Sequence, residues 1–71
     1  MTAAADRPRE LSSELERLAE QLADLAMDLL REGLADGTDE GAALATQQSK
    51  VVNRARSSVE KAVLLLRRLP V

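Results

Sequence analysis

The chain has 71 residues, of which ten are Lys or Arg and twelve are Asp or Glu, giving a formal net charge of −2 at pH 7. It has no cysteine, histidine or aromatic residue, which excludes disulfides and removes the side chains that most often bind zinc or activate a serine nucleophile. From this composition we expect a protein that is not an enzyme, with no catalytic residue, no cofactor, no metal and no small-molecule substrate.

The apolar residues are spread along the chain rather than gathered in one segment. The longest uninterrupted apolar run, residues 62–66, has five residues, whereas a membrane-spanning helix needs about 20. The first nine residues lack the apolar stretch of a secretory signal. We therefore predict a cytoplasmic protein without a membrane span. Abundant Ala and Arg and the absence of Ile are typical of GC-rich genomes, such as those of actinobacteria and their phages.

The first half of the chain predicts a long helix. Residues 1–7 are small or polar and are expected to form a disordered tail. Pro8 suits the first turn of a helix, because its missing N–H would have no partner there. From Pro8 to about residue 35, leucines recur at alternating spacings of four and three residues, which indicates one left-handed packing seam. The leucines of this predicted seam are Leu11, Leu15, Leu18, Leu22, Leu25 and Leu29.

Residues 36–38 predict a turn. Gly37 can adopt the left-handed conformation that ends a helix, and Thr38 can cap the helix that follows. Because the connection is short, the two helices should be antiparallel neighbours. We therefore expect one all-α domain over residues 8–71, an antiparallel two-helix hairpin.

A second helix is expected over about residues 39–69, ending before Pro70. Its seam has the same alternating spacing of four and three residues as the first, but it is less apolar because Gln48 and Ser58 lie on it. We interpret these two polar residues as a device that sets the register of packing. The large apolar residues of this predicted seam are Leu44, Val51, Leu65 and Leu69.

Each helix carries further apolar residues beside its seam. Two helices alone bury one stripe each, so a chain this small has a marginal core unless other subunits complete it. We therefore predict that the hairpin forms a homodimeric, coiled-coil-like four-helix bundle, or docks another protein. The predicted oligomer or partner interface comprises Ala19, Ala23, Ala26, Leu30, Val52, Ala55, Val59, Ala62 and Leu66.

Charge is divided between the two helices. Residues 8–35 carry three basic and seven acidic residues, whereas residues 42–69 carry six basic and one acidic residue. This division favours antiparallel pairing, and it is expected to place Glu14 beside Lys61. The basic residues of the second helix are Lys50, Arg54, Arg56, Lys61, Arg67 and Arg68.

Two functions are compatible with these features. The first is a non-catalytic protein–protein interaction and oligomerisation module, acting as a small regulator or adaptor. The alternative is a nucleic-acid-binding protein that uses the basic face of the second helix. The absence of aromatic residues to stack on bases, together with the acidic helix alongside, favours the first.

Overall fold

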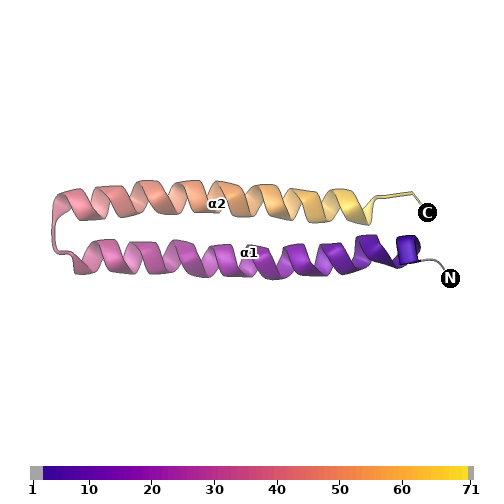
Figure 1. The fold of residues 1–71 in the computed structure, drawn as a ribbon. Coiled ribbons are helices and arrows are strands. Elements are labelled where there is room, and N and C mark those ends of the chain that lie inside the picture. The colour runs from indigo at the N-terminus through magenta and orange to yellow at the C-terminus, as the bar shows by residue number, and fades with distance from the viewer. Residues whose placement is uncertain (1–2, 71) are drawn as a thin grey trace.

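The computed structural model describes residues 3–70, which form an antiparallel hairpin of two long helices (Figure 1). Helix α1 spans Ala3–Ala35 and helix α2 spans Asp39–Arg67. The hairpin is narrow, with principal extents of 57 × 14 × 9 Å. The predicted all-α hairpin is confirmed for this part of the chain, within which no strand occurs.

The ends of the helices differ from the predicted ones by a few residues. α1 begins at Ala3, so residues 3–7 of the predicted tail are helical, while residues 1–2 lie outside the described part of the chain. Pro8 is therefore inside α1, one turn after its start, where it lacks the N–H that would otherwise bond to the carbonyl oxygen of Ala4. α2 ends at Arg67, two residues before the predicted position.

The turn has the predicted chemistry. Gly37 adopts a φ of 74°, which a residue with a side chain rarely takes. Thr38 is the N-cap of α2, and its Oγ1 accepts a hydrogen bond from the N–H of Gly41 at 2.9 Å. The same hydroxyl donates to Oδ2 of Asp36 at 2.7 Å. The first bond satisfies a backbone N–H that the start of a helix leaves free, and the second holds the Thr38 side chain in place across the turn.

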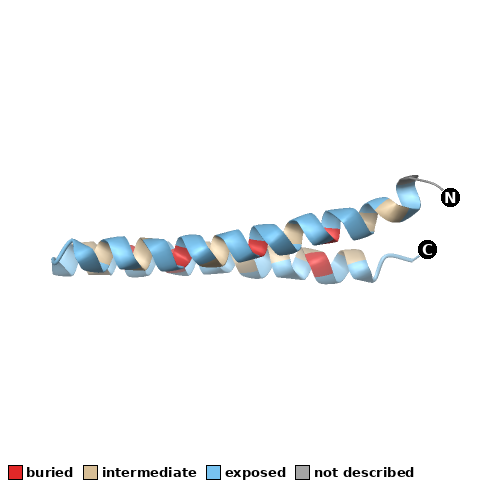
Figure 2. Ribbon diagram, turned by 90° about the horizontal axis from the view of Figure 1, so that it is seen from below, coloured by how far each residue is buried: buried red, intermediate tan, exposed pale blue. Residues whose placement is uncertain are grey.

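Small residues line the contact between the two helices. The buried apolar side chains are those of Ala19, Ala26, Ala45 and Val63, three of which are alanines (Figure 2). On α1 the row continues at seven-residue intervals with Ser12, which is buried, and Gly33. Small side chains let the two backbones approach closely. The centre of the contact is therefore made by close packing of small residues and not by interlocked leucines.

The predicted leucine seams are not the line along which α1 and α2 meet. Leu11, Leu18 and Leu25 are exposed, and the alternate leucines Leu15, Leu22 and Leu29 are only half-buried. On α2 the predicted seam is exposed throughout, at Leu44, Val51, Leu65 and Leu69. The reason is that adjacent apolar rows on a helix share the same period, so that periodicity does not show which row faces the neighbouring helix.

The row predicted to face a partner lies instead mostly between α1 and α2. Ala19 and Ala26 are buried there, and Ala55 alone of the set is exposed. The remaining members are half-buried, namely Ala23, Leu30, Val52, Val59, Ala62 and Leu66.

Gly33 marks a close approach of the helices, and replacing it should loosen the hairpin. A Cβ atom at Gly33 would lie 2.2 Å from Cβ of Ala45 and 2.8 Å from the carbonyl oxygen of Gly41. Gly33→Ala should therefore lower the free energy of unfolding by about 1–3 kcal/mol, although alanine is the better helix former. Chemical denaturation measures this, and the variant that also carries Ala45→Gly should recover part of the loss. A stabilised Gly33→Ala variant would show that the helices are not this close.

Candidate functional site

Most exposed leucines and valines of the two helices lie on one side of the hairpin, with Leu34 and Leu64 as exceptions. A shallow groove on this side is lined by Leu29 of α1 together with Leu44, Val51 and Val52 of α2. Leu44 and Val51 belong to the predicted seam of α2, and Leu29 to that of α1. The two seams therefore do not face each other but open on the same side, which we call the apolar face. It comprises Leu11, Leu15, Leu18, Leu22, Leu25, Leu29, Leu44, Val51, Val52, Ala55, Val59, Ala62, Leu65, Leu66 and Leu69.

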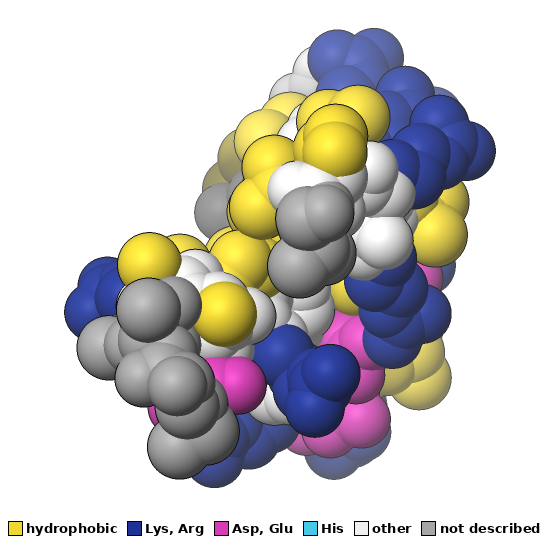
Figure 3. All heavy atoms as spheres, turned by 90° about the vertical axis from the view of Figure 1, so that its right-hand side faces the viewer, with side chains coloured by type: hydrophobic (Ala, Val, Ile, Leu, Met, Phe, Trp, Pro, Cys, Tyr) yellow, Lys and Arg dark blue, Asp and Glu magenta, His cyan; other side chains and the backbone are white. Residues whose placement is uncertain are grey.

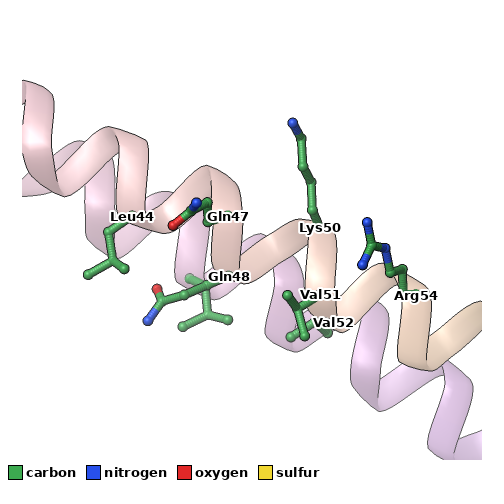
Figure 4. A pocket seen from close by; sticks show the side chains of 8 residues that line it. Leu44, Gln47, Gln48, Lys50, Val51, Val52 and Arg54 are labelled. Atoms are coloured by element: carbon green, nitrogen blue, oxygen red, sulfur yellow. The ribbon is translucent and has the colours of Figure 1, made fainter.

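The side chains of α2 that line this groove point to different sides of the helix. Leu44, Val51 and Val52 extend to one side of the helix, and Gln48 lies among them, whereas Lys50 points the opposite way (Figure 4). Gln48 is thus an exposed polar group on the apolar face. This fits its predicted place on the seam of α2, although that seam is open rather than buried.

The opposite side of the hairpin carries more charge. A second groove there is lined by five charged residues, Glu16, Glu20, Arg56, Glu60 and Arg67, and by four apolar ones, Ala19, Ala23, Val63 and Leu64. The guanidinium of Arg67 pairs with the carboxylate of Glu16, and the Arg56 guanidinium lies 3.8 Å from the Glu60 carboxylate. Seen end-on from the termini, many hydrophobic side chains gather toward the upper left and acidic ones toward the lower right, while Lys and Arg side chains lie on several sides (Figure 3).

The ion pair between Glu16 and Arg67 should contribute little to stability. Both side chains are about half exposed, so solvent screens their attraction. We expect Arg67→Ala to change the free energy of unfolding by less than about 1 kcal/mol, as exposed pairs usually do. Thermal unfolding followed by circular dichroism checks this, with Arg17→Ala as the control at an exposed arginine of α1 outside the ion pairs of residues 3–70. A loss of several kcal/mol would mean that the charged side holds the hairpin together.

The six basic residues predicted as one face are split into two groups. The exposed ones are Lys50, Arg54, Lys61, Arg67 and Arg68, of which Arg67 is paired with Glu16. Arg56 instead lies half-buried along the line of contact with α1, where its Nε atom has no hydrogen-bond partner among the described residues. The structure therefore does not bring the six residues together on one surface.

Two buried serines were missed by the sequence analysis. Ser12 and Ser49 lie in the contact between the helices, while Ser58 on the predicted seam is exposed. The hydroxyl of Ser12 donates to the carbonyl oxygen of Pro8 at 2.8 Å, and that of Ser49 to the carbonyl oxygen of Thr46 at 3.1 Å. Each hydroxyl is satisfied within its own helix, so the serines act as small residues. The seven-residue spacing of Ser12 from Ala19 and Ala26 was the signal that could have revealed the row.

Within residues 3–70, no group of three or more acidic side chains is arranged to hold a metal ion. Neither helix combines the length and the apolar content that crossing a membrane requires. The most prominent feature of the described chain is therefore the apolar face. In comparisons with known proteins, the chain matches no family model, no curated protein and no solved structure.

Proposed function

We propose that this chain is a non-catalytic protein–protein interaction module, whose hairpins associate through their apolar faces into a homodimeric four-helix bundle. The observation that carries the proposal is that most of the exposed large apolar side chains, though not Leu34 and Leu64, lie on one side of the hairpin. Leu18 and Leu25 are 43% and 44% exposed, and Val51 and Leu65 are 62% and 65% exposed. A large exposed apolar surface of this kind marks an interface.

The small core supports the same conclusion. The buried apolar residues of the hairpin are three alanines and one valine, and no large side chain among the described residues is fully buried. Each large apolar side chain that moves from water into a core contributes about 1.5–3 kcal/mol. In the single hairpin the large apolar side chains stay at least partly in water, so much of this stabilisation is missing. Packing against the apolar face of a second copy would supply it.

The exposed area is larger than that of a compact monomer. The chain exposes 5712 Å², whereas a folded monomer of 7.7 kDa exposes about 4,300 Å². The excess of roughly 1,400 Å² is more than the ~800 Å² that each partner contributes to a standard interface. Pairing of two hairpins through their apolar faces would therefore bury part of this excess area, and each copy would contribute apolar surface.

Sedimentation equilibrium of matched leucine variants tests the proposal. We expect the unmodified chain to sediment as a dimer, and Leu25→Glu to sediment as a monomer, because a carboxylate would be buried in the apolar interface. Leu34→Glu is the matched control, since Leu34 is 68% exposed but outside the apolar face. It should remain a dimer.

Two outcomes contradict the proposal. One is a folded monomer at every concentration, and the other is equal loss of the dimer in Leu25→Glu and Leu34→Glu. Ala55→Glu gives a second probe on α2, because Ala55 is exposed on the apolar face. We expect it to dissociate the dimer as well.

Nucleic-acid binding through α2 was the alternative function, and the arrangement of the basic residues does not favour it. Five of them are exposed, but one of these, Arg67, is paired with Glu16, and Arg56 lies half-buried against α1. A gel-retardation assay at low salt separates the two functions, because phosphate binding would weaken steeply as salt is added.

A further inference from the structure

Two rows of exposed charged or polar residues border the apolar face. Glu14, Gln21 and Asp28 each follow an exposed leucine of α1 by three residues, so they run along its outer margin; we call this row the acidic edge. On α2 a second row follows Val51, Ser58 and Leu65 by three residues in the same way. This row, the basic edge, comprises Arg54, Lys61 and Arg68.

The two edges cannot meet within one hairpin. All six side chains are exposed, on the sides of α1 and α2 that face away from each other. Asp28 pairs with Arg31 of its own helix at 3.6 Å, and the ion pair that joins the two helices uses Glu16 and Arg67 instead. The expected placement of Glu14 beside Lys61 is therefore wrong for a single hairpin.

We propose that the occupant of the apolar face is a second copy of this chain with its turn at the same end, so that α1 of each copy lies against α2 of the other. This inference rests on the proposed dimer and adds its orientation. In this arrangement the acidic edge of each copy lies beside the basic edge of its partner, on both margins of the interface. Opposite charges at the rim of an interface select the orientation of the partners.

The residues of the two edges also lie at similar positions along the long axis of the hairpin. In an antiparallel pair, two residues that lie side by side have numbers with a nearly constant sum. This sum is 78 for Gly33 and Ala45 and 83 for Glu16 and Arg67. A partner with its turn at the same end keeps these positions. Each facing pair of edge residues has numbers that add up to 82, namely Glu14 with Arg68, Gln21 with Lys61, and Asp28 with Arg54.

The reversed orientation places like charges together. With the turns at opposite ends, α1 would lie against α1 of the partner and α2 against α2. Glu14 would then approach Asp28 of the other copy, and Arg54 would approach Arg68 of the other copy. Repulsion on both margins disfavours this arrangement.

Distances between spin labels distinguish the two orientations. The chain has no cysteine, so Glu40→Cys places a single label near the turn, and Arg17→Cys places one near mid-height on the outside of α1. With the turns together, the labels at position 40 should be separated by less than about 30 Å, given interhelical spacings of 8–10 Å and the reach of the labels. With the turns apart, their separation should approach the 57 Å length of the hairpin.

The Arg17→Cys label is the control for dimerisation, because it gives a short distance in both orientations. A short distance at position 17 with a long one at position 40 overturns the orientation and leaves the dimer intact. The absence of a dipolar signal at both positions contradicts the dimer itself. Short distances at both positions support the inference.

Charge exchange across the edges gives an independent test. Arg54→Asp should raise the dissociation constant of the dimer about tenfold, because it introduces two like-charge contacts by symmetry. Asp28→Arg in the same chain should restore the affinity, since the facing pair is then reversed in sign. Lys50→Glu is the matched control, an exposed base of α2 outside the basic edge, and it should change the affinity little. Failure of Asp28→Arg to rescue Arg54→Asp would contradict the assigned pairing.

Discussion

Leu22→Asp is expected to unfold the protein. Leu22 is half-buried, in the leucine row between the line of small residues and the exposed leucines of the apolar face. In the proposed bundle this row points to the centre of the four helices, where a carboxylate would have no water and no partner. Burying an unpaired charge and losing a leucine together cost about 3 kcal/mol or more, a large share of the stability of so small a domain. Circular dichroism as a function of temperature measures the loss of helix.

Gln21→Asp provides the matched control for Leu22→Asp. It introduces the same side chain at the adjacent position, which is exposed on the acidic edge. We expect it to be neutral or slightly stabilising in the dimer, because the proposed orientation places Lys61 of the partner subunit opposite. Equal destabilisation by the two substitutions would show that helix propensity, rather than burial, explains the effect.

Ala26→Leu is expected to separate the two helices. Ala26 is 3% exposed and lies in the row of small residues through which α1 contacts α2. Three additional carbon atoms cannot fit between backbones that approach this closely, so the helices must move apart or shift in register. Overpacking of this kind costs about 1–3 kcal/mol. The melting temperature should fall even though leucine is more hydrophobic than alanine.

The control for Ala26→Leu is Ala43→Leu, which adds the same atoms at an exposed position of α2. It should leave the melting temperature nearly unchanged. A stabilised Ala26→Leu variant would show that the interhelical contact accommodates large side chains, as the predicted leucine seam requires. Melting should also depend on protein concentration in every dimeric variant, because association stabilises the folded state.

Local chemistry near residues 36–38 was enough to predict the turn and the helix ends on either side of it. Gly37 takes the left-handed conformation and Thr38 caps α2 as expected, because these preferences depend on a few neighbouring backbone groups. The end of α1 at Ala35 and the start of α2 at Asp39 follow from them. The start of α1 was misplaced, because Pro8 suits the first turn of a helix but does not prevent a helix from continuing before it.

The sequence by itself determined that both helices carry wide apolar surfaces, since the repeat of leucines and small residues is a property of each helix alone. Only the tertiary structure decided which row joins the helices. Alanines, serines, a valine and a glycine do so, and the leucines are half-buried or exposed. The physical reason is that adjacent rows share one period, so the choice between them depends on how closely two backbones can approach. That distance is a property of the pair of helices.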